Sequence, residues 1–463
     1  MPHALALAVE MATTGLAVAG MGYFLVAWIS ARMYLHERRM VLKRAARPAG
    51  EAVCFAPGVS ILKSLKGLDP GIEEAFASHC RQNYAGEFEL LFGVSSHDEP
   101  AIAAVEQLRR EFPQRAIRIV ECPERLGPNG KVSTLAQLAA HARYEFLLIN
   151  DADITVSPRY LERVMAGFAV DAAPAAMKEA QAGSAKGREV RGAEAAAKER
   201  REGYFAVLAA NPDPAPMQAY SAEPVARADS PEEPGAGKAP PCVGLVTALY
   251  RGRAHETLPS HLEALGIATE FIPGVLVSKW LEGGLHFGLG ATLAVRRDAL
   301  EKAGGLLGLV DYLADDYELG ARIARTGYRV ALSAEVVETA VPAYDWRGFF
   351  AHQLRWLRTV REARPWGYAG MVFTHGLGWA LVNVLASGLS LVSLWLLGLS
   401  FFLRLAVAMT VGAVVLEDHQ VLTWLWLLPL RDLVAMGLWA AGFAGDSVVW
   451  RGERFVLCDG KLQ

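Results

Sequence analysis

The sequence predicts an α/β domain with a parallel sheet, held between apolar helices that cross a membrane near both ends of the chain. Three observations support this prediction. Short apolar runs alternate with amphipathic stretches from Val59 onward, which is typical of strands joined by helical crossovers. Apolar segments before and after this region are long enough to span a bilayer as helices. Acidic residues follow predicted strands, at the edge where open α/β sheets bind their ligands.

The composition limits the classes of function. At 463 residues the chain can form one large domain or two ordinary ones. Hydrophobic residues make up 52% and charged residues 21%, which is a mildly membrane-like balance. A net charge of -3 provides no basic field and argues against nucleic acid as a partner. The five cysteines are too far apart to suggest a zinc site or a disulfide framework, so we expect reduced thiols facing the cytoplasm.

Residues 1–31 are predicted to form an N-terminal transmembrane anchor. The stretch 4–29 is apolar apart from Glu10. A signal peptide is the alternative, but no basic residue precedes the stretch and no convincing small-residue cleavage site follows it. The basic residues come directly after it: Arg32, Arg38, Arg39, Lys43, Arg44 and Arg47. The positive-inside rule then predicts an integral membrane protein with its main domain in the cytoplasm.

Residues 55–345 form the predicted α/β domain. In its first half we expect strands at 59–62, 90–94, 117–120 and 146–149, and helices at 100–111 and 132–142. Residues 171–241 are rich in Ala, Pro, Glu, Lys and Gly and cannot bury enough apolar surface to order themselves. We interpret them as a low-complexity surface insertion, helical in part around 193–205. After it we expect a strand at 243–247, helices within 254–284, a glycine-rich approach to a strand at 288–295, and a helix from Asp315 to about Thr326.

The region after the domain divides into a surface helix and membrane helices. Residues 346–368 intersperse arginines with aromatic residues and are predicted to form an interfacial helix. Residues 371–446 are predicted to hold the C-terminal membrane helices, in apolar stretches at 371–397, 398–416 and 421–444. The third stretch contains Arg431 and Asp432, so we expect it to be re-entrant or interfacial and to face protein rather than lipid. Basic residues near the C-terminus favour two crossings over three.

The acids at the ends of predicted strands are the first candidate site residues. Asp151 and Asp153 follow the strand at 146–149. Two carboxylates at positions i and i+2 there can hold a divalent metal, and the metal can hold a diphosphate. Asp98 follows the strand that ends at Val94, where a carboxylate can accept a hydrogen bond from a nucleobase or ribose. The alternative for all three is that they are turn or helix-capping acids.

A lysine and a second acidic pair extend the candidate site. Lys131 lies in a Gly/Pro-rich loop that opens a helix, where a cation and backbone N–H groups can meet phosphate. Asp316 is the candidate general base for transfer of a sugar to an alcohol. In such a reaction a carboxylate removes the proton of the accepting hydroxyl as the sugar carbon is attacked. Its neighbour Asp315 can raise the pKa of Asp316 by like-charge repulsion. The alternatives are a solvated lysine and an acidic helix start.

Arg355 and Trp356 are the candidates in the interfacial helix. A cation there can lie beside a leaving diphosphate, and an aromatic side chain can form a wall beside the acceptor. The alternative is that both residues extend toward the membrane surface and stabilise the position of the helix.

Taken together, these residues make the chain resemble the ceramide glucosyltransferase family, including its bacterial hopanoid-glycosylating relatives, which are related to family 2 glycosyltransferases. The match covers nearly all of the chain except the insertion. The segments that carry it are 57–67, 97–101, the Asp151–Asp153 motif, 314–317 and 449–455.

The resemblance implies a GT-A type catalytic domain, a UDP-sugar donor, Mg or Mn, and inversion at the anomeric carbon. It implies that Asp98 binds the donor, that Asp151 and Asp153 serve the diphosphate and the metal, and that Asp316 is the base. The family's Q/R-x-x-R-W motif is matched in part, because His352 stands where Gln or Arg is usual. We assign His352 and Trp356 to the acceptor. Ser64 also stands where the family often has Pro.

The leading interpretation is an enzyme that moves one hexose or N-acetylhexosamine from a UDP-sugar to a hydroxyl of a membrane lipid, either ceramide-like or a hopanoid. The first alternative is a processive polysaccharide synthase, for which the few predicted helices leave little material for a channel. The second is a catalytically inactive membrane scaffold. Acids at separate strand and helix ends argue against a scaffold, since a binding module has no need of them.

Overall fold

A mixed seven-stranded sheet organises the central domain. The computed structural model describes residues 2–45, 55–68, 71–169, 242–450 and 452–463, so the predicted insertion at 171–241 lies outside the described residues. The strand order is β3-β2-β1-β4-β6-β5-β7. The strands are β1 (Val59–Ser64), β2 (Phe88–Val94), β3 (Ala116–Glu121), β4 (Phe146–Ile149), β5 (Val243–Arg253), β6 (Leu293–Arg296) and β7 (Arg329–Ala340).

The sheet is not wholly parallel, which corrects the prediction. The strands β1 to β4 pair in parallel, and so do β5 and β7, but β6 runs antiparallel to both β4 and β5. The glycine-rich stretch ahead of β6 lies against β5, where the Thr247 hydroxyl donates to the Thr292 carbonyl at 2.7 Å and accepts from the N–H of Leu289 at 3.0 Å. The strands β1 and β2 are buried along their whole length, as expected for strands covered on both faces.

Helices connect the strands in the order expected of an α/β domain. Before the insertion they are α2 (Ile72–Cys80), α3 (Ala101–Glu111), α4 (Gly130–Ala139) and α5 (Tyr160–Ala169). After it come α8 (Leu258–Gly266), the π-helix η1 (Ile267–Phe271), α9 (Ile272–Leu281), α10 (Arg297–Lys302), the short η2 (Leu307–Leu309) and α11 (Asp315–Arg325). The predicted α/β domain, flanked by apolar helices, is confirmed.

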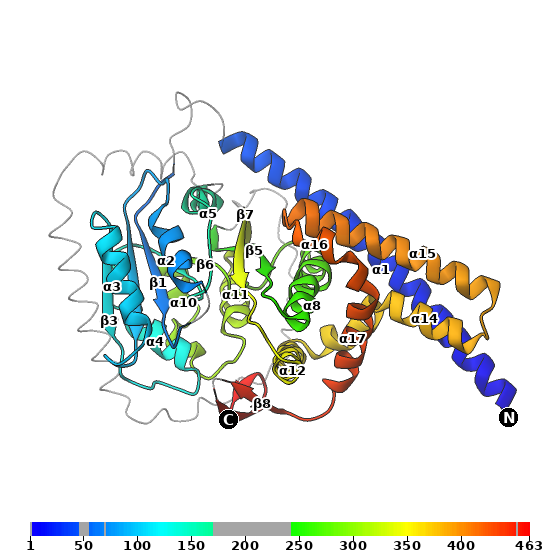
Figure 1. Ribbon diagram of the computed structural model, residues 1–463. Helices are drawn as coiled ribbons and strands as arrows, with labels where there is room; N and C mark the ends of the chain where they lie inside the picture. Colours follow the sequence, from blue (N-terminus) through cyan, green and yellow to red (C-terminus); the bar gives the residue numbers. More distant parts are fainter. Residues whose placement is uncertain (1, 46–54, 69–70, 170–241, 451) are drawn as a thin grey trace, which may run out of the picture.

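A long first helix and three helical segments after the domain fit an integral membrane protein. The predicted anchor is part of α1 (Pro2–Ala45), which continues well past the apolar stretch. Figure 1 shows α1 running beside α14 (Gly376–Ala386) and α15 (Leu391–Ala408), away from the sheet. The helices pack closely, since a Cβ on Gly20 would lie 2.2 Å from the Cα of Gly376. Only glycine permits this crossing.

The C-terminal apolar stretches divide at a different place from the one predicted. The chain turns at residues 387–390, not at 397/398, and α15 then continues through the π-helix η4 (Met409–Val415). Leu389 there has φ of 64°. The segment before the turn is bent by 56° between residues 365–374 and 376–386. The last segment consists of α16 (Gln420–Trp424), η5 (Leu425–Leu427) and α17 (Leu428–Ala441).

A further apolar segment, Leu258–Leu281, was not predicted as a span. It is also long and apolar enough to cross a membrane, but 61% of its most apolar 18-residue stretch is buried inside the protein. This segment comprises α8, η1 and α9, and it lies between the sheet and the membrane helices. Its apolar character therefore serves the packing between the two parts of the molecule.

The charges in the last apolar stretch face protein, in agreement with the sequence analysis. Arg404 on α15 donates to both oxygens of Asp432, at 2.8 and 2.7 Å, and to the backbone oxygen of Thr269. Arg431 lies 2.8 Å from Glu270 on η1. These pairs satisfy charges that would be costly in lipid. They also connect the membrane helices to the helical segment that packs on the sheet.

The predicted interfacial segment is α12 (Trp346–Ala363), and it ends earlier than the predicted boundary at 368. Asp345 caps its start by accepting a hydrogen bond from the backbone N–H of Gly348 at 2.7 Å. The helix stops at Ala363 because Pro365 disfavours the helical conformation of Arg364 and starts the short helix α13 (Pro365–Gly370). A 3₁₀ turn, η3 (Met371–Thr374), follows.

A small sheet that the sequence analysis did not predict closes the chain. It consists of β8 (Ser447–Trp450), β9 (Glu453–Cys458) and β10 (Lys461–Leu462), and it packs on Leu313. Arg125 forms a bidentate pair with Glu453, at 3.2 and 2.6 Å, and the N–H of Leu462 donates to the Asp311 carbonyl. The C-terminal end thereby lies against the loops that precede α4 and α11.

Candidate active site

The turn after β4 carries the Asp151–Asp153 motif, and a buried lysine holds it. The ammonium of Lys63, at the end of β1, donates to the backbone oxygen of Asp151 at 2.9 Å. Lys63 is only 1% exposed. Burial lowers the pKa of Lys63 to about 7, against the opposing charges of Asp153 and Asp151. The turn is thus positioned from beneath by a neighbouring strand.

The side chains of Asp151 and Asp153 have different protein partners. One oxygen of Asp153 accepts hydrogen bonds from the Thr339 hydroxyl and from the backbone N–H of Ala340 at 3.1 Å. Both partners lie at the end of β7. Burial raises the pKa of Asp153, and the nearby charge of Asp151 adds to this. Asp151 instead forms an ion pair with Lys131, at 2.7 Å.

Lys131, in the first turn of α4 just after a Gly/Pro-rich loop, reaches both acidic pairs. Its ammonium lies 2.7 Å from Asp151 and 3.5 Å from Asp315, so it bridges residues that are far apart in sequence. Burial by itself lowers the pKa of Lys131, but Asp151 and Asp315 more than offset this effect, and the ammonium stays charged. Buried Asn129 caps α4 through the N–H of Val132 and donates to the carbonyl of Tyr312. The loop is therefore fixed on α4 and on the segment before α11.

Asp316 lies in the first turn of α11 and faces the same space as Asp151. A Cβ on Gly290 would lie 3.0 Å from Asp316 Oδ2 and 3.7 Å from Asp151 Oδ2. Burial, and then the neighbouring charge of Asp315, raise the pKa of Asp316 to about 6. The Asp316 side chain also accepts from the N–H of Tyr317 at 2.8 Å. The glycine keeps open the space between the two carboxylates.

The residues of the turn can supply ligands to a divalent metal. Within the described residues, no group of three His, Cys, Asp or Glu side chains could hold a metal by itself. Mg²⁺ usually takes one or two carboxylates together with substrate phosphates, and carboxylate oxygens also suit Mn²⁺. Asp151 and Asp153 fit this requirement, with the remaining ligands left to a diphosphate.

Asp98 is exposed in the loop after β2, and within the described part of the chain it makes no ion pair. Its neighbours are held: His97 lies 2.9 Å from Glu121, and Glu99 accepts from the N–H of Gly67. The loops after β1 and β2 are thus tied together at the carboxyl edge of the sheet. The structure leaves the donor-binding role of Asp98 as a prediction.

The interfacial helix α12 brings His352 and Trp356 next to a buried glutamate. Nδ1 of His352 lies 3.0 Å from Oε2 of Glu263 on α8, and Gln353 donates to the same oxygen at 3.2 Å. The rings of His352 and Trp356 lie 5.1 Å apart. Glu263 is only 3% exposed, so these two donors supply the hydrogen bonds that its carboxylate needs. Arg355 is half-buried on the same helix.

Aromatic side chains connect α12 to the acids. The ring of Trp356 lies 6.0 Å from that of Phe271, which lies 5.7 Å from the ring of Tyr250 on β5. Burial, followed by the charges of Asp316 and Glu263, raises the pKa of Tyr250 well above its ordinary value. The phenol therefore stays protonated, between the candidate base on one side and the glutamate of α8 on the other.

The structure thus brings together Asp151, Lys131, Asp315 and Asp316, and Asp153 lies in the same turn as Asp151. The helix α12 is separated from these acids by the rings of Tyr250 and Phe271. The sequence analysis missed the residues that position these groups: Lys63, Asn129, Glu263, Gly290 and Thr339. For Lys63 there was a signal, a charged residue in an otherwise apolar strand. For Thr339 there was none, since its strand was not predicted.

Comparison with known proteins gives a family match over most of the chain. The family described as "Glycosyl transferase family 21" matches residues 19–187 and 238–463. A "Ceramide glucosyltransferase" of Komagataella phaffii is 34% identical over 110 residues, covering 23% of this chain and 21% of that protein. "Ceramide glucosyltransferase 1" of Caenorhabditis elegans is 33% identical over 102 residues, covering 22% of each. The match therefore spans about a fifth of the length of these curated relatives.

Solved structures show a weaker likeness. A mannosyltransferase from Pyrobaculum calidifontis, in complex with GDP-Man and Mn²⁺, has a TM-score of 0.41 and 16% identity, covering 92% of this chain and 97% of that one. TarS 1-349 of S. aureus, in complex with UDP-GlcNAc, has a TM-score of 0.35 and 11% identity, covering 87% of this chain and 98% of that one. Likenesses at these scores carry no inference about the present chain.

Proposed function

Because the chain belongs to glycosyl transferase family 21, we propose that it transfers one hexose or N-acetylhexosamine from a UDP-sugar to a hydroxyl of a membrane lipid. A ceramide-like lipid or a hopanoid polyol is the acceptor. The observation that carries the proposal is that Lys131 bridges Asp151 and Asp315, while Asp316 faces the same space beside Gly290. This arrangement provides a cation for a diphosphate and a carboxylate for an acceptor proton at one edge of the sheet.

In the proposed reaction, Asp316 removes the proton of the acceptor hydroxyl as its oxygen attacks the anomeric carbon. The new carbon–oxygen bond forms on the face opposite the diphosphate, and the bond to the diphosphate breaks with its electron pair leaving on the phosphate oxygen. The configuration at the anomeric carbon is therefore inverted. The pKa of about 6 suits Asp316 to this role, because the carboxylate is ionised at neutral pH and still accepts a proton readily.

The donor is held by groups from three loops. Lys131 faces the diphosphate, and Asp98 accepts hydrogen bonds from the uridine. Mg²⁺ or Mn²⁺, bound by Asp151 and Asp153, would neutralise the phosphate oxygens. Arg355 on α12 adds positive charge on the leaving side, while His352 and Trp356 contact the acceptor. Glu263 supports this last assignment, since it orients the His352 ring through a 3.0 Å contact to Nδ1.

The membrane placement follows from the acceptor and from charge. Basic residues follow the apolar part of α1, and under the positive-inside rule they support our proposal that the catalytic domain faces the cytoplasm. The proposed location is a bacterial inner membrane, in line with the resemblance to bacterial lipid glycosyltransferases. A lipid with long chains gains nothing by leaving the bilayer, because each exposed CH₂ costs about 0.8 kcal/mol. The acceptor therefore reaches the site from the membrane, past α12.

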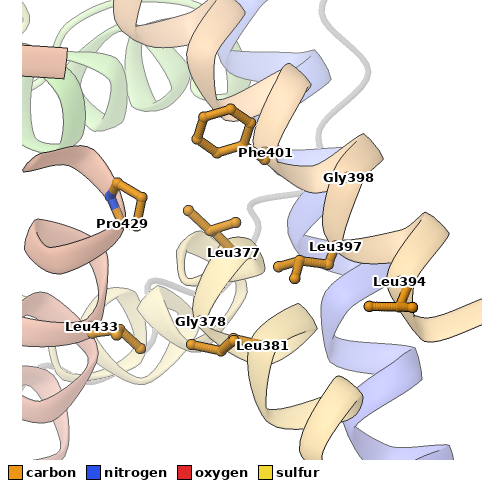
Figure 2. Close-up of a pocket in the computed structure, with 9 residues that line it drawn as sticks. All are labelled: Leu377, Gly378, Leu381, Leu394, Leu397, Gly398, Phe401, Pro429 and Leu433. Carbon is orange, nitrogen blue, oxygen red and sulfur yellow. The ribbon is translucent and has the colours of Figure 1, made fainter. Parts of the chain in front are cut away.

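An apolar groove among the membrane helices offers a place for the acceptor's hydrocarbon chain. Figure 2 shows it between α14, α15 and α17, with a volume of about 390 Å³. Its lining residues are all apolar: Leu377, Gly378, Leu381, Leu394, Leu397, Gly398, Phe401, Pro429 and Leu433. Between the last two, Arg431 pairs with Glu270 and reaches Gln353 on α12 at 3.5 Å. The helix α17, which lines one side of the groove, therefore also contacts α12, the helix that holds the proposed acceptor residues.

A bulky side chain in the groove tests this assignment. A Cβ on Gly398 meets nothing within 4 Å, so Gly398→Leu fills the groove without backbone strain. We expect a raised KM for a long-chain lipid acceptor, with an unchanged KM for a short-chain one. Gly437→Leu is the matched control, because Gly437 is also helical and has open space around its Cβ but does not line the groove. Equal effects of both variants would rule out the groove.

The function itself is tested by donor turnover. The purified protein, reconstituted in vesicles that contain ceramide or a hopanoid polyol, should release UDP only when Mg²⁺ or Mn²⁺ is present. Mass spectrometry should detect the lipid carrying one sugar. Longer oligosaccharides would indicate a processive synthase instead, and no UDP release with any donor and acceptor pair would indicate a scaffold.

A further inference from the structure

A basic cavity lies at the junction of α1 and the end of the α15–η4 helix, outside the proposed active site. Its volume is about 330 Å³. The residues that line it are Arg32, Leu35, His36, Arg39, Thr410 and Val414. The four from α1 have the spacing i, i+3, i+4 and i+7, so they share one face of the helix. Nothing in the proposed transfer reaction uses this face.

The described part of the chain places no acidic side chain against the arginines of this basic cavity. Within the described residues, neither Arg32 nor Arg39 has an acidic partner, and Arg32 lies over the ring of Trp28, 5.4 Å from its centroid. Arg38, on another face of α1, differs from both. It lies 2.9 Å from Glu417 and donates to the Ala334 carbonyl at 2.8 Å. The basic cavity therefore presents two guanidinium groups that a bound anion can satisfy.

The position along both helices places the basic cavity at the level of lipid headgroups. Trp28 lies one turn before Arg32, and tryptophan is enriched at the membrane–water interface. Thr410 and Val414 belong to the last turns of the apolar helix Leu391–Val415. These turns form a π-helix, a local widening that is frequent at functional sites. Apolar and basic side chains thus meet where a phospholipid changes from hydrocarbon to phosphate.

We propose that this basic cavity binds the phosphate of an anionic phospholipid. The guanidinium groups of Arg32 and Arg39 pair with the phosphate oxygens, while Leu35 and Val414 contact the first part of an acyl chain. The proposal is independent of the transfer reaction. Bound lipid would join α1, which packs on β7 through Tyr34 and Arg38, to the end of α15.

The test is a binding measurement on the full chain in mild detergent. Native mass spectrometry should show phosphatidylglycerol bound more tightly than phosphatidylcholine. Each of Arg32→Gln and Arg39→Gln should weaken phosphatidylglycerol binding by about fivefold. This factor corresponds to the attraction of about 1 kcal/mol that one basic residue contributes near an anionic lipid surface. Lys43→Gln is the matched control, because it removes one charge from an exposed position of the same helix outside the basic cavity.

Two further measurements separate the alternatives. Inorganic phosphate, added in excess, should leave phosphatidylglycerol bound; displacement at similar concentrations would identify free phosphate as the ligand and overturn the lipid assignment. Thermal unfolding of each variant checks that the fold is retained. Equal weakening by Lys43→Gln, or no preference for phosphatidylglycerol in the unsubstituted chain, would likewise overturn the proposal.

Discussion

At the scale of single residues, Asp316 is the group on which the proposed chemistry depends most. We predict that Asp316→Asn folds and binds the UDP-sugar but loses transfer by roughly 10²–10⁴-fold, the usual contribution of a positioned base. The amide has the same shape as the carboxyl group but cannot take the proton. Initial rates and donor binding by calorimetry measure the two properties. Near-normal turnover would place the base elsewhere, with Asp315 the first candidate.

The pKa of Asp316 predicts a direction for the pH dependence. A base works in its ionised form, and burial together with Asp315 raises the pKa of Asp316 to about 6. Activity should therefore be full above this pH and fall as the pH drops through about 6. Asp315→Asn removes the like charge, lowers the pKa of Asp316 and should move the acid limb of the profile to lower pH. An unchanged limb in that variant would contradict the assignment.

The Asp151–Asp153 motif makes a separate prediction. We expect Asp153→Ala, and also Asp151→Ala, to abolish metal-dependent donor binding, since metal and diphosphate share these ligands. Calorimetry of UDP with and without Mn²⁺ measures it. Thr339→Val is the control for Asp153, because it removes the hydroxyl that donates to this carboxylate and leaves the carboxylate in place. Metal dependence retained in both Asp variants would remove the motif from the site.

At the scale of elements, α12 connects the α/β domain with the C-terminal segments. Its side chains reach α8 through Glu263, and its arginines Arg358 and Arg361 donate to backbone oxygens beside β8. The buried pair of Arg404 and Asp432 holds the helices beneath it. Removing one partner of such a pair leaves an uncompensated buried charge and is strongly destabilising, so Arg404 and Asp432 depend on each other.

This arrangement leads to a prediction for two neighbours on α12. Arg355→Ala should depress transfer to every acceptor, because its charge is assigned to the leaving diphosphate. Trp356→Ala should impair long-chain acceptors more than short soluble ones, since its ring is proposed to line the path by which the lipid acceptor enters. Rates with both acceptor classes measure the difference. If each variant lost activity equally on the two acceptors, Trp356 would have a structural role only.

At the scale of the whole molecule, the question is whether the protein works without the predicted insertion at 171–241. Gly167 on α5 packs against Val246 on β5, where a Cβ would meet it at 2.8 Å, so the described elements on either side of the insertion are in contact. The family match also leaves residues 188–237 unmatched. We predict that replacing residues 175–235 with a Gly/Ser linker retains transfer activity, because loop closure depends weakly on length.

Activity and thermal unfolding of the shortened protein check this prediction together. A folded but inactive protein would show that the insertion takes part in the reaction or in acceptor binding. A protein that does not fold would instead show that the insertion stabilises the domain.

Much of the architecture could be predicted because short stretches of sequence determine it. The apolar run at 146–149 is a buried strand, the acids at 151 and 153 follow it, and Asp315 starts α11 as expected. The helix break within the apolar C-terminal region was misplaced, since hydropathy alone does not mark the turn at 387–390. The strand β7 was missed because its polar residues interrupt the alternation that marks a strand.

The sequence by itself determined the class of fold, the apolar helices and the carboxylates at strand and helix ends, because periodicity and position along an element are local properties. Only the tertiary structure decided which groups meet. Lys131 bridges two acidic pairs from distant loops, Lys63 holds the turn of Asp151, and β7 brings Thr339 to Asp153. These contacts arise from the order and direction of strands in the sheet, which depend on packing between segments far apart in the chain.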